Sequence, residues 1–306
     1  MGGGSAVKQY KRRFLQGKPE NTGRKDRCEE ALQKLRSFGE YEIRETESGK
    51  YKLIKADITI GVFSEACVEK ERILFPLSCG MLLEVSKEGA REIAIFEKAV
   101  LFGLVSSDGS NAYYWRIDSK GRHHSEYSTR FYSEDKELIE LFDGLFEKIY
   151  GLTPHHYVRE RNGLITAAIY SRGVFYDLSD YGVKTGAYEF RVPREHLDYD
   201  GKRAYLKGFF SGDGKASLTR EGSLTIRFYS KCKEGLEGLR QLLIDLDFHP
   251  YEIREEKEEP EGVVYWFSIP SREHKKFIEE IGSFKPRHRE VFEAYKRLRG
   301  EKNEGS

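Results

Sequence analysis

Two Asp-Gly pairs, each directly after an apolar segment of helical pattern, are the residues of this sequence best suited to metal chemistry. Asp108 follows 101–107 and Asp213 follows 206–212. A carboxylate at a helix C-terminus faces the negative end of the macrodipole, and two such carboxylates brought together also repel each other. A divalent cation relieves both penalties, because Mg²⁺ binds one or two carboxylates together with substrate phosphate oxygens. The pair therefore predicts a metal site that stabilises in-line phosphoryl displacement.

The alternative for each Asp-Gly pair is an ordinary turn at the end of a helix. Because both copies follow matched helices, the repetition favours the metal interpretation. The expected cofactor is Mg²⁺, and Mn²⁺ or Ca²⁺ can substitute for it in binding. The predicted metal ligands are Asp108, Asp213 and the residues before them, Ser107 and Gly212.

Small residues with i, i+4 spacing on both segments predict that two helices pack closely at this site. They are Gly103 and Ser107 in the first segment, and Gly208 and Gly212 in the second. A glycine within a helix costs about 1 kcal/mol, so its presence in both copies favours a packing role over simple softening of buried helices. We expect helices over about 91–107 and 202–212, each followed by a glycine in the left-handed conformation.

The two segments belong to a longer internal repeat. The sequence TRFYSEDKELIELF at 129–142 aligns with IRFYSKCKEGLEGL at 226–239. In both copies a short alternating strand precedes a helical pattern, and the full order in each copy is αββαββα. We therefore predict an α+β fold with two halves, 91–198 and 199–299, related by a pseudo-two-fold axis.

Three further features give the repeat a family resemblance. The paired helices, the segment RVPRE at 191–195 and the element IGSFKPR at 281–287 together resemble the double-motif LAGLIDADG homing endonucleases. The resemblance covers about 91–299. It implies a saddle of two four-stranded antiparallel sheets in the DNA major groove, with the two signature helices as its central interface. It also implies that Asp108 and Asp213 are catalytic, bind the metals and serve one DNA strand each.

The resemblance also implies an activity and a partner. Family members cleave both strands of a long double-stranded DNA target by metal-assisted phosphodiester hydrolysis, leave short 3′ overhangs and support the mobility of an intron or intein. A chain with both motifs is expected to act as a monomer. The alternatives are a non-cleaving nucleic-acid-binding protein of the same fold, either a maturase or a transcription regulator, and a structural module in which the Asp-Gly pairs are simple caps.

The sequence departs from the family pattern at one catalytic position in each half. A basic residue after the fourth strand, usually Lys, assists the family's active site. Arg172 and Arg272 occupy the matching positions here. Because arginine does not readily give up its proton, these residues can stabilise a charged phosphate but cannot serve as a base.

Strand alternation predicts which side chains face DNA. In the repeated strands Phe131 and Phe228 should point to the helices, while the flanking Arg and Tyr residues point to the major groove. For each basic residue alone, a solvated or salt-bridged arginine is the alternative. The predicted DNA contacts are Arg116, Lys120, Arg122, Arg130, Arg159, Arg161, Lys215, Arg220, Arg227 and Arg254.

Composition limits the remaining possibilities. Charged residues make up 34% of the chain but nearly cancel, with a net charge of +1, so DNA binding requires locally basic surfaces. The high charge content resembles that of thermophilic proteins rich in salt bridges. The cysteines show no CxxC spacing, and no signal peptide or membrane-spanning run is visible. These features predict a cytoplasmic, DNA-associated protein with no membrane partner.

The N-terminal part carries the weakest pattern. Residues 1–20 form a tail that opens with an artificial-looking linker, MGGGS, and 300–306 form a second tail. Residues 21–90 are predicted to be an α+β extension, either an additional DNA-binding module or a packing domain. Its expected elements are an amphipathic helix over 24–37, a hairpin of 41–45 with 50–60, and a strand pair within 74–85.

Overall fold

A computed structural model of the chain describes residues 33–34, 41–46, 50–55, 58–63, 66–68, 72–77, 79–117, 119–183, 189–258 and 262–304. The chain divides into two compact units, Met1–Phe96 and Glu97–Ser306. The helix expected over 24–37 lies almost entirely outside the described residues.

The first unit is built from two small antiparallel sheets. One has the order β1-β2-β3 and the other β4-β5-β6-β7. The strands are β1 (Tyr41–Glu45), β2 (Tyr51–Lys55), β3 (Ile58–Phe63), β4 (Cys67–Val68), β5 (Arg72–Pro76), β6 (Met81–Ser86) and β7 (Gly89–Ala94). The predicted strand pair is confirmed as β5 and β6. The predicted hairpin was incomplete, because 50–60 contributes to two strands of a three-stranded sheet.

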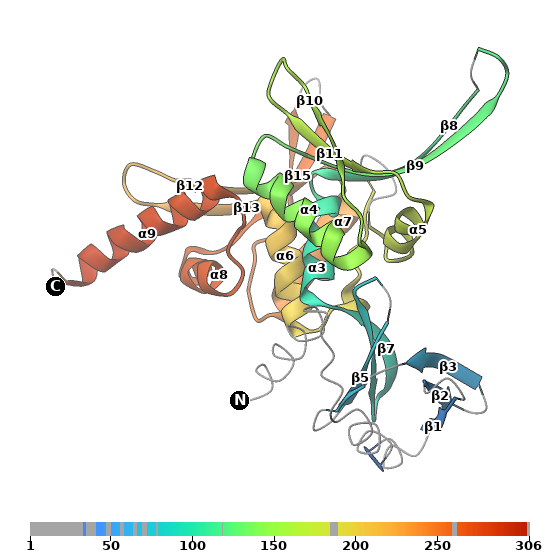
Figure 1. Cartoon of the computed structure of the whole chain (residues 1–306). Coiled ribbons are helices and arrows are strands. Elements are labelled where there is room, and N and C mark those ends of the chain that lie inside the picture. The colour runs from blue at the N-terminus through green and yellow to red at the C-terminus, as the bar shows by residue number, and fades with distance from the viewer. Residues whose placement is uncertain are drawn as a thin grey trace. The chain divides into compact units, whose positions relative to one another are not determined.

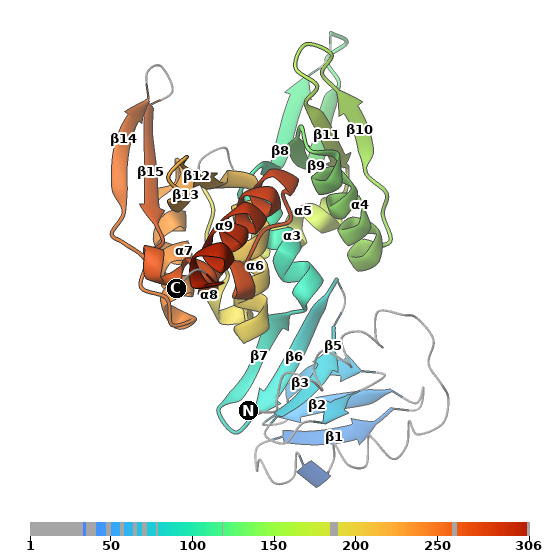
Figure 2. The same ribbon diagram turned by 90° about the vertical axis from the view of Figure 1, so that its left-hand side faces the viewer.

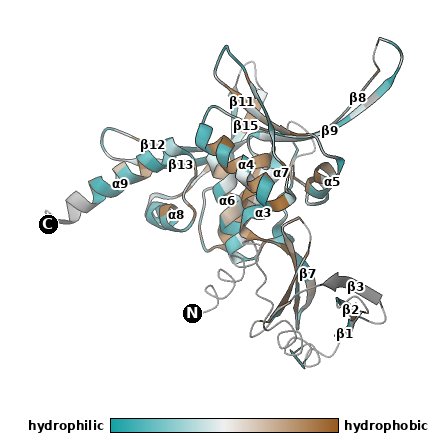
Figure 3. Ribbon diagram, in the orientation of Figure 1, coloured by the Kyte–Doolittle hydropathy of each residue, from teal (hydrophilic) through white to brown (hydrophobic). Residues whose placement is uncertain are grey.

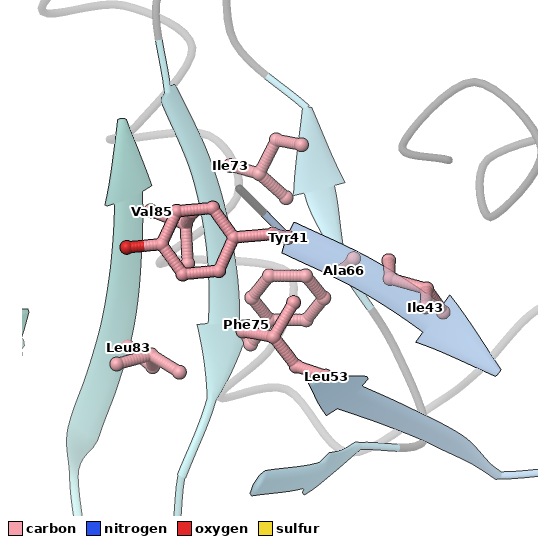
Figure 4. Close-up of a cluster of buried hydrophobic side chains, with 8 residues drawn as sticks. All are labelled: Tyr41, Ile43, Leu53, Ala66, Ile73, Phe75, Leu83 and Val85. Atoms are coloured by element: carbon pink, nitrogen blue, oxygen red, sulfur yellow. The ribbon is translucent and has the colours of Figure 1, made fainter. Parts of the chain in front are cut away.

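Apolar side chains from both of these sheets form the core of the first unit. Tyr41, Leu53, Phe75 and Val85 are buried and belong to one cluster, in which they point toward one another (Figure 4). The alternation of buried and exposed residues along β1 explains why this short strand keeps a defined register.

The predicted start of the first signature helix was wrong. Residues 91–94 belong to β7, where Ile93 pairs with Leu82 and Ala94 pairs with Met81. Ile93 and Ala94 are fully buried in that sheet. Strand pairing therefore overrides the helical pattern, and the helix α3 begins only at Phe96.

The second unit contains the predicted duplication. Its first half comprises α3 (Phe96–Ser106), β8 (Gly109–Ile117), β9 (His123–Ser133), α4 (Lys136–Tyr150), β10 (His155–Val158), β11 (Ile165–Ile169) and α5 (Arg172–Asp180). After η1 (Arg194–His196), the second half comprises α6 (Tyr199–Asp213), β12 (Gly214–Leu218), β13 (Leu224–Ser230), α7 (Lys233–Asp245), β14 (Arg254–Glu258), β15 (Gly262–Ser268), η2 (Ser271–Glu273) and α8 (His274–Glu280). The helix α9 (Pro286–Glu304) follows. The predicted order αββαββα is thus confirmed in both halves.

The two four-stranded sheets of this unit have the same strand arrangement. Their orders are β10-β11-β9-β8 and β12-β13-β15-β14, and all pairings are antiparallel. Both views of the chain show α3 and α6 side by side at the centre of this unit, between the two sheets (Figures 1 and 2). The fold is therefore α+β, with two similar halves meeting at a central helix pair.

Each half has an aromatic core between its sheet and its helices. Phe131 stacks on Phe142 of α4 with ring centroids 5.1 Å apart, and Phe228 stacks on Phe267 at 5.0 Å. Both strand phenylalanines are fully buried, as strand alternation predicted. The outer surfaces of α4 and α9 are mainly hydrophilic (Figure 3). Because the two phenylalanines face the helices, the polar face of each repeated strand points away from them.

The second signature helix begins earlier than its apolar pattern suggested. It starts at Tyr199, because Asp198 accepts a hydrogen bond from the Gly201 amide at 2.8 Å and so caps the first turn. Among the described residues, none of the helices combines the length and apolar character needed to cross a membrane.

Candidate functional site

Glycine allows the backbones of α3 and α6 to touch. A Cβ atom at Gly103 would lie closer than 3.0 Å to the Tyr205 carbonyl oxygen and the Phe209 nitrogen. A Cβ atom at Gly208 would lie equally close to the Val100 carbonyl oxygen. These contacts are with backbone atoms, which cannot move aside as a flexible side chain can. The small residues predicted at this interface therefore have a direct steric purpose.

The close contact continues to the ends of both helices. A Cβ atom at Gly212 would meet the Ser107 side chain and lie 3.0 Å from Oδ2 of Asp108. The Asp108 carboxylate is therefore beside the residue that precedes Asp213. Asp108 and Asp213 are both partly exposed, whereas Ser107 and Gly212 are buried. The four predicted metal-site residues thus lie together at one end of the helix pair.

The glycines after the two aspartates do not have the expected left-handed conformation. Gly214 has φ −83° and ψ 156°, and it begins β12 directly. A Cβ atom there would collide with Phe210, and one at Gly109 would lie 2.6 Å from the Val105 Cα. Glycine is required because each strand departs across the last turn of its own helix. This tight exit holds each aspartate at the junction of a helix and a strand.

A buried hydrogen bond across the helix pair was not anticipated from the sequence. The Tyr205 hydroxyl of α6 donates to Oγ of Ser106 in α3 at 3.0 Å. Burial raises the pKa of Tyr205, so its hydroxyl remains a donor throughout the neutral range. Ser106 lies two residues before Asp108, and Tyr205 lies eight residues before Asp213. Neither belongs to a distinctive motif, so only the contact between the helices identifies them.

The chemistry of the donor set fits a hard cation shared with a substrate. In the described part of the chain, no group of three His, Cys, Asp or Glu side chains forms a complete metal cage. Carboxylates from two residues at one end of the helix pair would leave several coordination positions for water and phosphate oxygens, as Mg²⁺ prefers. The residues present therefore suit a metal that binds together with a phosphodiester.

The two arginines after the fourth strands lie at the borders of the sheets. The guanidinium of Arg172 lies 5.7 Å from the ring centroid of Tyr127 and 5.5 Å from that of Tyr176. Tyr127 precedes Phe131, the strand partner of Gly109, by four residues, or about 13 Å along the strand. Arg272 lies in η2, and 73% of its side chain is exposed beside Glu273. These contacts direct Arg172 toward an aromatic cluster rather than toward Asp108.

The polar face of the first sheet combines arginine with tyrosine. The Arg130 guanidinium lies 5.4 Å from the Tyr114 ring centroid and 3.0 Å from Oε1 of Glu126. Partial burial lowers the pKa of Arg130, but the hydrogen bond with Tyr132 and the electrostatic interactions with Tyr132, Tyr114 and Tyr170 together outweigh this effect and raise it. The arginine therefore stays charged on the face that alternation assigned to DNA.

The second sheet has a stacked arrangement at the matching place. The Trp266 ring centroid lies 4.4 Å from the Arg227 guanidinium and 5.4 Å from that of Arg254. Arg227 also donates to the Tyr229 hydroxyl at 3.3 Å. Both arginines were predicted from the sequence and Trp266 was not, although aromatic residues interleaved with arginine along paired strands are a usable signal. Stacking of this kind fixes guanidinium planes for recognition of planar base edges.

The remaining predicted DNA contacts lie on strands and turns at the borders of the two sheets. Arg116 pairs with His124 in β8 and β9, and its side chain lies outside the described residues. The others are exposed, in the turns between paired strands or on β12: Lys120, Arg122, Arg159, Arg161, Lys215 and Arg220. Lys120 and Arg122 lie between the strands of the long β8–β9 hairpin, which extends away from the helices (Figure 1).

Solved structures with a related fold include several homing endonucleases. Variants of the homing endonuclease I-DmoI share 19% identity, with a TM-score of 0.45, over 61% of this chain and 95% of theirs. The I-LtrWI LAGLIDADG homing endonuclease bound to target DNA shares 12% identity, with a TM-score of 0.43, over 66% of this chain and 89% of its own. The meganuclease I-SmaMI bound to uncleavable DNA shares 14% identity, with a TM-score of 0.44, over 65% and 87%.

A family model matches part of the second half. A search of curated proteins found no match to this chain. Residues 200–282, however, match the family model of the LAGLIDADG-like domain. This segment contains most of α6, Asp213 and the whole second sheet. The second half of the chain is therefore similar to the LAGLIDADG-like domain family, in agreement with the resemblance carried by its motifs.

Proposed function

We propose that this protein is a site-specific homing endonuclease that cleaves both strands of a long DNA duplex by metal-assisted phosphodiester hydrolysis. The observation that carries the proposal is the contact between Gly212 and the Asp108 carboxylate. It brings the acidic ends of α3 and α6 to a common point. An arrangement that concentrates negative charge at two helix C-termini is costly, and a bound divalent cation relieves that cost.

The two aspartates would hold the metal, and the sheets would hold the DNA. Bound Mg²⁺ supplies the positive charge that stabilises the attacking and leaving oxygens of the displacement. Asp108 and Asp213 fix the position of that charge at the junction between helix and strand. Arg130, Arg227 and Arg254 lie on the polar sheet faces, where they can bind guanine edges or phosphates.

A library selection tests this function directly. The full chain is incubated with plasmids that carry randomised long duplex inserts in Mg²⁺, and linear products are sequenced. We expect cleavage of a narrow set of targets with short 3′ overhangs. Asp108→Asn and Asp213→Asn should each lower the cleavage rate by about 10²-fold or more, since several kcal/mol of charge stabilisation are lost, while DNA affinity persists.

The second candidate is a non-cleaving nucleic-acid-binding protein of the same fold, such as a maturase or a transcription regulator. The place of Arg172 favours it, because the contacts of this arginine with Tyr127 and Tyr176 draw it along the sheet away from Asp108. Selective DNA binding without cleavage, in either Mg²⁺ or Mn²⁺, would establish this candidate and overturn the nuclease.

A further inference from the structure

The last turn of α6 is tied to a distant segment by a buried serine. Ser211 precedes Asp213 by two residues and is fully buried. Its Oγ donates to the Lys207 carbonyl oxygen at 2.7 Å and accepts from the Phe284 amide at 2.8 Å. The same oxygen lies 3.2 Å from Oγ of Ser283. Three interactions therefore converge on one hydroxyl beside the acidic end of the helix.

The hydrogen bonds continue from Ser283 to a buried histidine. Ser283 Oγ accepts from the Lys285 amide at 3.1 Å and lies 3.1 Å from Nδ1 of His288. The His288 ring packs against Phe210, with centroids 5.0 Å apart. Burial lowers the pKa of His288 to about 4, with help from Lys285 and Arg287, so the imidazole is neutral at pH 7.

One assignment of protons accounts for every contact named in this network. Ser211 donates to the helix carbonyl, so its oxygen can accept the proton of Ser283. Ser283 then accepts from Nδ1–H of His288, which fixes the tautomer of the neutral ring. The result is a directed chain from His288 through Ser283 and Ser211 to the backbone of α6. Such a continuous network is rigid, because each side chain loses a buried hydrogen-bond partner if another one moves.

The matching serine of the first half has a different anchor. Ser106 occupies the position of Ser211 in the repeat, two residues before Asp108. It accepts its hydrogen bond from Tyr205 across the helix pair, as described above. The two acidic ends are therefore held by separate groups, although the halves share one fold. Helix ends leave backbone carbonyls without intrahelical partners and fray readily unless they are anchored.

We propose that Ser211, Ser283 and His288 are positioning residues that hold the last turn of α6 and so fix the carboxylate of Asp213. Tyr205 and Ser106 do the same for Asp108. The inference rests on the proposed function and deepens it: if each aspartate serves one DNA strand, loss of one anchor slows the cutting of one strand only. A displacement of about 1 Å at a reacting group can lower a rate by about 10²-fold.

Hydrogen–deuterium exchange on the free protein, without metal or DNA, tests the positioning by itself. His288→Phe keeps an aromatic ring against Phe210 but removes the donor to Ser283. We expect amide exchange in 208–214 to rise about fivefold or more, as for the loss of one hydrogen bond, with no change in 103–109. His288→Asn retains a side-chain N–H near the position of Nδ1 and should restore slow exchange. Tyr205→Phe should give the reverse pattern.

Strand-resolved cleavage of a selected target gives the second measurement. We expect His288→Phe to accumulate a nicked duplex, with one strand cut about tenfold more slowly and the other nearly unchanged. Tyr205→Phe should slow cleavage of the opposite strand, and His288→Asn should cut the two strands at nearly equal rates. Equal slowing of both strands, or unchanged exchange in 208–214, would overturn the positioning role. If the wild-type chain cuts no target, the nuclease proposal fails, while the exchange experiment still decides the role of His288.

Discussion

Single glycines determine how closely the two central helices approach. Gly103 and Gly208 each face backbone atoms of the partner helix at distances that no Cβ could tolerate. A side chain at either position must push the helices apart or bend them. Gly144 in α4 offers a matched contrast, because a Cβ there would meet nothing within 4 Å.

The contrast between these glycines gives a prediction at the residue scale. Gly103→Ala should lower the free energy of unfolding by about 3 kcal/mol, the upper end for overpacking, because rigid backbone blocks the new methyl group. Gly144→Ala should instead raise it by up to about 1 kcal/mol, since alanine restricts the unfolded chain and favours the helix. Urea titration of both variants measures the difference. Similar effects of the two substitutions would contradict the steric explanation.

The paired strands create the proposed recognition surface, which no single residue defines. Alternation along β13 buries Ile226 and Phe228 and turns Arg227 to the opposite side. Pairing with β15 then places Trp266 against Arg227 and Arg254. The strand register therefore decides which aromatic ring orients which arginine.

This surface leads to a prediction at the scale of the element. Arg227→Ala should weaken binding of the selected duplex about tenfold and relax preference at one or two base pairs, as expected for the loss of a base contact. Lys275→Ala on α8 is the matched control, because that side chain is 84% exposed and belongs to a helix rather than to the sheet face. Fluorescence anisotropy with the selected target and single-base variants measures both. Equal changes in DNA affinity for the two substitutions would argue against a DNA-binding sheet face.

Because the charges of the whole molecule nearly cancel, its binding to a charged partner depends on where the charges lie. The net charge is +1 despite 52 basic residues, so no general attraction to polyanions is available. In the proposed complex with DNA, binding must come from local groups, in which arginines replace the counterions of several phosphates.

Salt dependence tests that conclusion for the intact chain. If the sheet faces contact about six to ten phosphates, the affinity for the selected duplex should fall by about 10³-fold or more between 50 and 200 mM salt. Anisotropy titrations at a series of salt concentrations give the slope. A flat response would exclude the proposed interface with the DNA backbone.

The sequence by itself determined the repeat, the order of elements and the acidic ends of the two helices. These features are local, because the period of apolar residues sets helix or strand, and duplication makes each weak pattern visible twice. The same alternation correctly placed Phe131 and Phe228 in the core. Small residues on both signature helices likewise predicted the close packing, since their spacing selects one face of a helix.

Only the tertiary structure decided features that depend on residues distant in the chain. Residues 91–94 pair with β6 and form part of a strand, so α3 starts only at Phe96. Steric contact with the preceding helix turn, rather than a left-handed conformation, explains Gly109 and Gly214. The network from His288 to Ser211 joins segments that share no local pattern. Hydrogen bonds and close contacts between remote segments depend on how the halves pack, and spacing along the chain does not encode that geometry.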